Sequence, residues 1–221
     1  WGSPSAPVWS DSIFYLSGYV KGGHDCVTDP NTQDVYVAHI SYAVSNYKCY
    51  FTKWSAADWT STTTEIGATW TTDFTTPAGC CSIRVQSSGR IVVFYGFRSS
   101  YSDDGGSTFQ DYAFGAFDSV ATSPHTHTRI RVFEVGGQLC AISLVSNDDV
   151  QQYASQDEGK TWVQLQDATQ TLGTEFDVTE MPDGSAWVGY RDAAHHMKAF
   201  QMTSAYQLVS NLTAGAEAVT S

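Results

Sequence analysis

Residues 155–162 read Ser155-Gln-Asp157-Glu-Gly159-Lys-Thr161-Trp162, and residues 102–109 read Ser102-Asp-Asp104-Gly-Gly106-Ser-Thr108-Phe109. Both stretches follow the pattern Ser-x-Asp-x-Gly-x-Thr-aromatic. An Asp carboxylate accepts hydrogen bonds from backbone N–H groups of a tight turn, and Gly adopts a positive φ at little steric cost. The closing aromatic ring is large and apolar and fills space between sheets. The repeated turn motif therefore predicts two β-hairpins of the same construction.

The motif resembles the Asp-box of the sialidase-like, or BNR-repeat, β-propellers. In that family the Asp-box lies on the hairpin that joins the last two strands of a blade, remote from the active site. The resemblance therefore implies a structural role for the motif and says more about the fold than about the function. The residues concerned are Ser102, Asp104, Gly106, Thr108, Phe109, Ser155, Asp157, Gly159, Thr161 and Trp162.

The rest of the chain repeats at the interval set by the motif. The closing aromatics Phe109 and Trp162 are separated by about 50 residues, and Trp59 and Trp9 precede them at similar intervals. Trp59 closes what is interpreted as a shortened copy of the motif, without its Gly and central Asp. Leu208 follows Trp162 after a further interval. The chain thus carries four repeats and a leading fragment.

Each repeat has the same internal order of predicted elements. A strand and a tight turn come first, an apolar second strand follows, and a third strand, the motif turn and a short fourth strand close the unit. The first turns contain Pro-Asn, Ser-Gly, Gly-Gly and Asp-Gly pairs, which are typical of hairpins. The second strands are apolar along their length, as expected for strands covered on both faces; they span 35–39, 91–95, 139–143 and 186–190.

Four antiparallel strands in about 40–50 residues make a β-propeller blade. We therefore expect an all-β fold, with one propeller domain of four-stranded blades over residues 1–221. A four-bladed ring is the first choice, and part of a larger ring from a longer chain is the alternative. Segments 60–79, 110–126 and 164–174 are interpreted as crossings between blades. The fragment around Trp9 either supplies an outer strand to the last blade or belongs to an upstream blade.

Composition restricts the partners and the compartment. The formal net charge is −12 with only 11 Lys and Arg residues, which argues against nucleic acid or an anionic membrane because such binding needs clustered cations. No run of about 18 apolar residues predicts a membrane span. Few Lys, many Tyr, Trp and Thr, and the sequon at Asn211 fit an extracellular, secreted or virion-surface protein. A start at Trp1 without Met indicates a segment of something longer.

The cysteines leave several pairings open. There are five of them, with no Cys-x-x-Cys pair to indicate zinc, and we expect at most one or two disulfides. A ring between Cys80 and Cys81, a bond from one of them to Cys26, and buried free thiols are all compatible with the sequence. The five are Cys26, Cys49, Cys80, Cys81 and Cys140.

The resemblance also implies a test for sialidase chemistry. Sialidases hold the substrate carboxylate with three arginines, since guanidinium groups are planar and bidentate, and the first of these lies at the start of the propeller. No arginine precedes Arg84 here, so we lean against an enzyme and predict no catalytic residue. Arg84, Arg90 and Arg131 are among the arginines expected mainly in surface or interblade salt bridges. The acidic residues select no pair spaced for glycoside hydrolysis.

Any ligand is predicted on the propeller face opposite the motif hairpins. The ends of the second strands converge there, at His39, Tyr95, Ser143 and Tyr190, and form a pocket that differs from blade to blade. The alternative is that these side chains only fill the channel. The predicted ligand-binding residues are His39, Tyr95, Arg98, His127, Arg129, Tyr190 and Arg191.

No cofactor and no metal are expected. There are two alternatives: weak Ca²⁺ binding at the pairs Asp103-Asp104 and Asp148-Asp149, and a transition-metal site. The second idea starts from His125 and His127, which would share one face of a strand. His24, His195 or His196 would complete it.

The function expected from these observations is non-catalytic recognition or adhesion. The partner would be a glycan or a cell-surface receptor, and the domain would belong to a larger extracellular or virion assembly of the tail or fibre type. Other domains or subunits of that assembly would be further partners. A sialidase-like glycoside hydrolase and a purely structural fibre or coat component are the alternatives.

Overall fold

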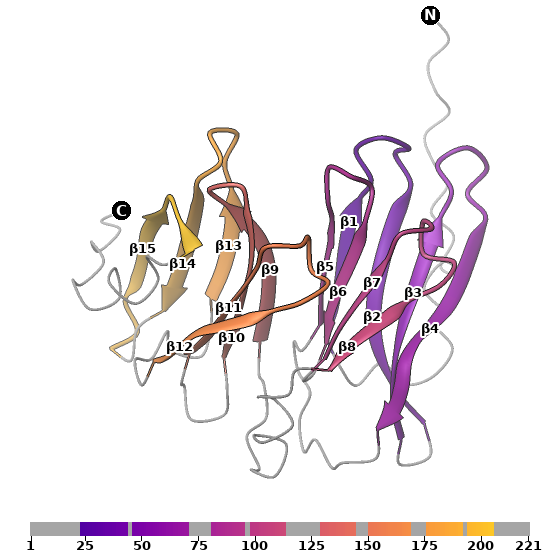
Figure 1. Cartoon of the computed structure of the whole chain (residues 1–221), viewed down its shortest axis with the longest axis horizontal. Helices are drawn as coiled ribbons and strands as arrows, with labels where there is room; N and C mark the ends of the chain where they lie inside the picture. The colour runs from indigo at the N-terminus through magenta and orange to yellow at the C-terminus, as the bar shows by residue number, and fades with distance from the viewer. Residues whose placement is uncertain are drawn as a thin grey trace, which may run out of the picture.

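The structure is a computed structural model. It describes residues 23–43, 46–70, 81–95, 98–113, 129–144, 150–168, 176–191 and 194–205. Within these ranges the chain forms β-strands in four separate antiparallel sheets (Figure 1). The expected all-β class is therefore confirmed. No helix in the described part is both long enough and apolar enough to cross a membrane.

In each sheet, strands that follow one another in sequence are neighbours. The first sheet contains β1 (His24–Thr28), β2 (Val35–Ala43), β3 (Asn46–Trp54) and β4 (Ser61–Trp70), and the second contains β5 (Cys81–Val85), β6 (Ile91–Tyr95), β7 (Arg98–Ser102) and β8 (Gln110–Ala113). The third contains β9 (Arg129–Val135), β10 (Gln138–Leu144), β11 (Val150–Ser155) and β12 (Val163–Ala168). The fourth has three described strands: β13 (Phe176–Glu180), β14 (Ala186–Arg191) and β15 (Met197–Met202).

The strands confirm the predicted order in the first three repeats and, as far as its third strand, in the fourth, and they correct the crossings. The apolar second strands became β2, β6, β10 and β14. The segments interpreted as crossings, however, begin with strands: β4 fills the first half of 60–79, and β8 and β12 open the other two. The polarity of the Thr-rich segment at the start of β4 predicted a loop. Thr is β-branched and suits a half-exposed outer strand, so it forms one.

Consecutive sheets pack on one another, with β1 against β5, β5 against β9, and β9 against β13. One apolar cluster joins the first three sheets, and a second joins the third and fourth. Among the described residues no packing of comparable extent joins β13 to β1. Figure 1 accordingly shows the first and fourth sheets at opposite ends of the row.

The strand registers give the sheets a common frame. Cys26 pairs with Val37 in the first sheet as Ile83 pairs with Val93 in the second. The corresponding pairs are Val132–Ala141 in the third sheet and Val178–Val188 in the fourth. Because side chains alternate along a strand, each sheet has one face toward the preceding sheet and one toward the next. Equivalent positions can therefore be compared from sheet to sheet.

The described cysteines are free thiols: Cys26 is exposed, and Cys49, Cys81 and Cys140 are buried. The disulfide alternatives that involved Cys81 are therefore wrong, and the free-thiol alternative holds for these four. Cys80 lies outside the described residues. Burial raises the pKa of the Cys140 thiol to about 12, so this group stays protonated and behaves as a small apolar side chain.

Candidate functional site

The two repeated turns join β7 to β8 and β11 to β12 and share one hydrogen-bond pattern. In the second turn, the Asp157 carboxylate accepts from the Thr161 backbone N–H at 2.8 Å, from the Thr161 hydroxyl at 2.6 Å and from the Ser155 hydroxyl at 2.8 Å. Ser155 Oγ in turn accepts from the Gly159 N–H at 2.8 Å. The predicted role of the Asp, to accept a hydrogen bond from a backbone N–H group of the turn, is therefore confirmed.

The first turn repeats these contacts almost atom for atom. Asp104 accepts from the Thr108 backbone N–H at 2.9 Å, from the Thr108 hydroxyl at 2.6 Å and from the Ser102 hydroxyl at 2.8 Å. These hydrogen bonds, those from Thr108 foremost, lower the pKa of Asp104 to about 2. Burial alone raises the pKa of Asp157, but the bonds from Thr161 and Ser155 outweigh it and hold the pKa below its ordinary value. Both carboxylates are therefore charged acceptors at neutral pH.

The closing aromatics of the turns pack on the preceding sheet. Phe109 lies 5.2 Å from Phe51 between ring centroids. Trp162 meets the ring of Phe94 edge-on at 5.5 Å, and its indole N–H donates to Ser99 Oγ at 3.1 Å. Each turn thus fastens its own sheet to the one before it.

Trp59 corrects the interpretation of the shortened copy. It has a positive φ of 58° and is 52% exposed, so it does not fill space between sheets as Phe109 and Trp162 do. The described residues contain no sheet that precedes the first one, so no such sheet covers Trp59. The Leu208 and Trp9 positions of the repeat pattern lie outside the described residues.

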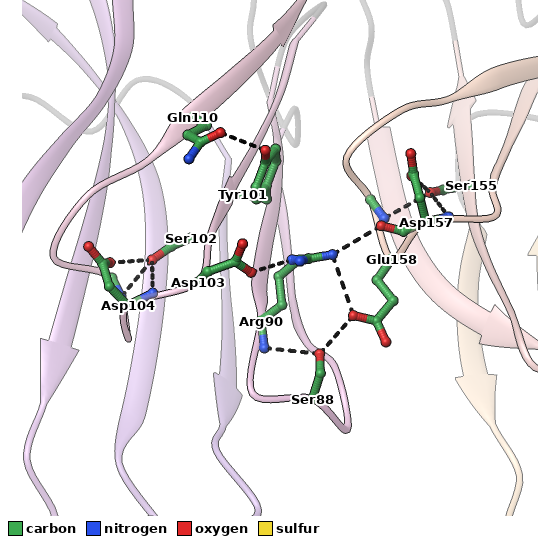
Figure 2. A network of polar contacts seen from close by, with 12 residues as sticks. Ser88, Arg90, Tyr101, Ser102, Asp103, Asp104, Gln110, Ser155, Asp157 and Glu158 are labelled. Carbon is green, nitrogen blue, oxygen red and sulfur yellow. Dashed lines mark hydrogen bonds and ion pairs between the residues drawn. The ribbon is translucent and has the colours of Figure 1, made fainter.

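Arg90 connects the two turns at the hairpin end of the second and third sheets (Figure 2). Its Nε donates to Asp103 at 2.5 Å, and a terminal nitrogen donates to the Asp157 carbonyl at 3.0 Å and lies 3.4 Å from Glu158. The guanidinium group also covers the Tyr101 ring, 5.2 Å from its centroid. The positive charge of Arg90 therefore pairs with Asp103 of its own sheet and with Glu158 of the third sheet.

Two first-strand arginines are held in the same way. Arg84 of β5 forms salt bridges with Glu134 of β9, at 3.1 Å, and with Glu180 of β13. Arg131 of β9 bonds to Asp177 of β13 at 2.6 Å. These ion pairs join the second, third and fourth sheets. The salt bridges between sheets expected for the arginines are therefore confirmed for Arg84, Arg90 and Arg131.

No ion pair is found in the described part of the chain for Arg98, Arg129 or Arg191. The registers put all three at the end of the sheets opposite the motif turns, where Arg98 pairs with Tyr95 and Arg191 pairs with Met197. They lie on three different sheet faces, however. Arg98 shares a face with Tyr95 toward the first sheet, Arg129 points with Arg131 toward the fourth, and Arg191 lies on the far face of the fourth. They do not converge on one carboxylate position.

The predicted ring of second-strand residues is buried. His39, Tyr95, Ser143 and Tyr190 occupy comparable registers and are 2%, 0%, 0% and 5% exposed. Their side chains are buried and do not form an open surface. The ligand-binding role assigned to them stays a prediction, as does that of His127, which lies outside the described residues.

Tyr95 is the end of a small polar cluster. Its hydroxyl bonds to Ser100 at 2.9 Å and to Asp111 at 3.3 Å, and Ser100 donates to Asp111 at 2.5 Å. Burial raises the pKa of Tyr95 well above its ordinary value. A neutral, fully buried phenol is a structural hydrogen-bonding group and a poor nucleophile. This cluster was not predicted from the sequence, because Asp111 lies in the segment that was interpreted as a crossing between blades.

His39 is the other unusual buried group. It stacks on Tyr50 with centroids 5.4 Å apart, and its Nδ1 is buried without a hydrogen-bond partner. Burial, with a smaller contribution from His24 across the strand pair, lowers the pKa of His39 to about 4. The imidazole is therefore neutral at physiological pH. Within the described ranges, no group of three or more His, Cys, Asp or Glu residues is arranged to hold a metal ion.

No protein-family model and no curated protein matches the chain. Solved structures do. The lectin of Aleuria aurantia, a six-bladed β-propeller that recognises fucose, matches with a TM-score of 0.50 and 11% identity over 80% of this chain and 56% of that one. A fungal alcohol oxidase of the AA5 family, in complex with copper, matches with a TM-score of 0.51 and 11% identity over 81% of this chain and 39% of that one.

A sialidase from Trypanosoma rangeli is also similar, at 15% identity over 81% of this chain and 36% of that one, with a TM-score of 0.44. The chain spans about half the length of the lectin. At such identities the likeness shows the fold alone: the sheets have the arrangement of consecutive β-propeller blades. The number of blades in a closed ring stays a prediction.

Proposed function

We propose that this chain is a non-catalytic recognition propeller that binds a glycan. The observation that carries the proposal is that the described arginines do not converge on one point. A carboxylate-holding site needs several unpaired guanidinium groups around one point. Arg84, Arg90 and Arg131 are instead paired with carboxylates of neighbouring sheets, and the others lie on different faces.

The charge of the chain favours a neutral glycan over an acidic one. A net charge of −12 works against the approach of an anionic ligand. Propellers of the same architecture include a fucose-binding lectin, which supports carbohydrate as the ligand class. An extracellular or virion-surface location, and a place in a larger adhesion assembly, belong to the same proposal.

Two assays on the 221-residue chain test it. A glycan array that contains neutral and sialylated glycans is expected to show binding to a neutral class, and a fluorogenic sialoside is expected to remain uncleaved. Hydrolysis of the sialoside would overturn the non-catalytic assignment. A folded protein that binds no glycan on the array would favour the structural fibre or coat component instead.

Conservative variants then locate the site. Tyr95→Phe, Tyr190→Phe and Arg191→Gln remove hydrogen-bonding groups at the predicted ligand face without opening cavities. At least one is expected to lower the affinity for the glycan found on the array by more than about twofold, or roughly 0.4 kcal/mol. Lys48→Gln, which breaks an exposed salt bridge with Glu65, is the matched control. Unchanged affinity in all three variants would put the site elsewhere.

A further inference from the structure

The sheets of this chain meet through one repeated kind of interface. In the second strands, Tyr36, Val92 and Cys140 occupy equivalent positions on the face toward the next sheet and are 2%, 0% and 0% exposed. Tyr36 packs on Phe51, which the next sheet covers with Phe109. Val92 lies against Gly159 of the third sheet. Each such face is closed by the sheet that follows.

In the part of the chain that the structure describes, no sheet covers the same face of the fourth sheet. Trp187 occupies the position of Tyr36, Val92 and Cys140, yet it is 42% exposed. Gly189, next on that face, would meet nothing within 4 Å if it carried a Cβ atom. Met197 on the neighbouring strand is 59% exposed. We call this surface the fourth-sheet end face; the registers assign to it Asp177, Thr179, Trp187, Gly189, Arg191, Met197, Ala199 and Gln201.

The first sheet exposes its opposite face along β1, whereas His39 and Thr52 on the neighbouring strands of that face are only 2% and 3% exposed. Cys26 occupies the position of Ile83 and Val132, which are 5% and 8% exposed under the preceding sheets. Cys26 itself is exposed, and His24 and Thr28 on the same face of β1 are exposed as well. The intervening residues Asp25 and Val27 face the second sheet and are partly covered. We call this surface the first-sheet end face.

The two end faces are the two halves of the interface that the chain builds between its own sheets. Figure 1 shows the first and fourth sheets at opposite ends of the row, so the halves do not meet within one copy. A second copy of the chain offers each end face the kind of surface that covers its equivalents inside the molecule. The occupant is thus defined by continuity with three interfaces already formed.

We propose that two copies of this chain associate head to tail, with the fourth-sheet end face of one copy against the first-sheet end face of the other. Such a contact is heterologous: the surfaces that meet are different on the two copies. It closes into a ring if the rotation allows and otherwise continues as a filament. Because each copy carries a net charge of −12, screening of the repulsion makes association stronger as salt rises.

Light scattering after size-exclusion chromatography tests the proposal on the 221-residue chain. The mass is expected to rise above that of the 24.1 kDa monomer as concentration increases. Trp187→Arg places a charged side chain on the fourth-sheet end face, and Cys26→Arg places one on the first-sheet end face. Each variant alone is expected to remain monomeric. Both positions are exposed, and unchanged circular dichroism and melting temperature would show that both variants fold.

The mixture of the two variants is the decisive measurement. A Cys26→Arg copy keeps an intact fourth-sheet end face, and a Trp187→Arg copy keeps an intact first-sheet end face, so equal amounts are expected to form a heterodimer. Val163→Arg changes a 65% exposed apolar residue of β12, away from both end faces, and should associate like the unchanged chain.

Three results would overturn the proposal. The first is an unchanged chain that stays monomeric at every concentration and salt level. The second is association of either variant alone to the same extent as the unchanged chain. The third is an unchanged chain that associates while the mixed variants do not, since that result would show a symmetric contact.

Discussion

Gly106 lies against the ring of Phe51 in the preceding sheet so closely that a Cβ atom at this position would overlap the ring. The glycine also has a φ of +89°. Its neighbour Gly105 has a φ of +70°, but a Cβ atom there would meet nothing within 4 Å. The second glycine of the turn is thus required both by the backbone and by the sheet on which it packs.

This pair of glycines gives the first prediction. Gly105→Ala should cost about 1 kcal/mol, the penalty for a left-handed alanine, whereas Gly106→Ala should cost about 2–4 kcal/mol because overlap with Phe51 is added. Urea denaturation of both variants measures the difference. Equal costs would mean that Phe51 moves aside freely and that the contact does not fix the turn.

The second prediction concerns the carboxylates of the repeated turns. Asp157→Ala removes the acceptor for three hydrogen bonds and should lower the free energy of unfolding by about 1–2 kcal/mol. Asp104→Ala should also lower the melting temperature, and Gln156→Ala, at an exposed neighbouring position, should not. Glycan affinity should be unchanged in all three. Loss of glycan binding with an unchanged free energy of unfolding would contradict the prediction and would mean that the turns take part in recognition.

His39 predicts a pH dependence with a definite sign. The ordinary His pKa of 6.5 falls to about 4 in the folded protein, so below pH 6.5 the unfolded chain takes up a proton that the folded chain does not. Stability is therefore complete above pH 6.5 and is lost as the pH falls, by about 2 kcal/mol at pH 5. His39→Phe, which keeps a ring on Tyr50, should remove this slope.

Urea denaturation between pH 5 and pH 7 checks that prediction. The window separates His39 from the turn carboxylates, whose lowered pKa values cause stability to be lost only below the ordinary Asp value of 3.8. His196→Gln, at an exposed position, is the control and should keep the slope. An identical slope in the His39 variant would show that another group titrates there.

Arg84 gives a prediction about pairs of substitutions. Arg84→Met leaves Glu134 and Glu180 close together without their shared cation and should cost about 1–3 kcal/mol. Adding Glu180→Gln should restore part of that loss because one of the two like charges is gone. Lys48→Met, at an exposed salt bridge, should change stability by less than about 1 kcal/mol. Additive effects of the two changes would argue against a coupled cluster.

Local sequence patterns predicted much of this fold. The apolar run at 91–95 specified β6 without ambiguity, and the Ser-x-Asp-x-Gly-x-Thr-aromatic pattern specified two hairpins together with the acceptor role of their Asp residues. Both signals are complete within a few residues. The Thr-rich start of β4 was missed, since a strand on the outside of a sheet has the polarity of a loop.

The contacts between sheets were harder to predict because they depend on which surfaces meet. Trp59 has the phase of a closing aromatic but is exposed, since no described sheet covers it. The partners of Arg84 come from β9 and β13, and no local spacing identifies them. Alignment of the repeats would have helped, because Glu134 and Glu180 both lie near the ends of first strands. The burial of Tyr95 and Tyr190 likewise depends on the neighbouring sheets.

The salt bridges of Arg84 bear on how the chain reaches this structure. Each hairpin closes between residues near in sequence and can form early, but Arg84 and Glu180 are 96 positions apart. Contacts between such distant residues slow the folding of β-rich proteins, because a long loop loses its entropy before the contact forms. During synthesis Arg84 emerges well before either carboxylate. The contacts of Arg84 in the second sheet therefore form only after β9 and β13 have folded. Until then the face of the second sheet that carries Arg84 is uncovered and prone to aggregation.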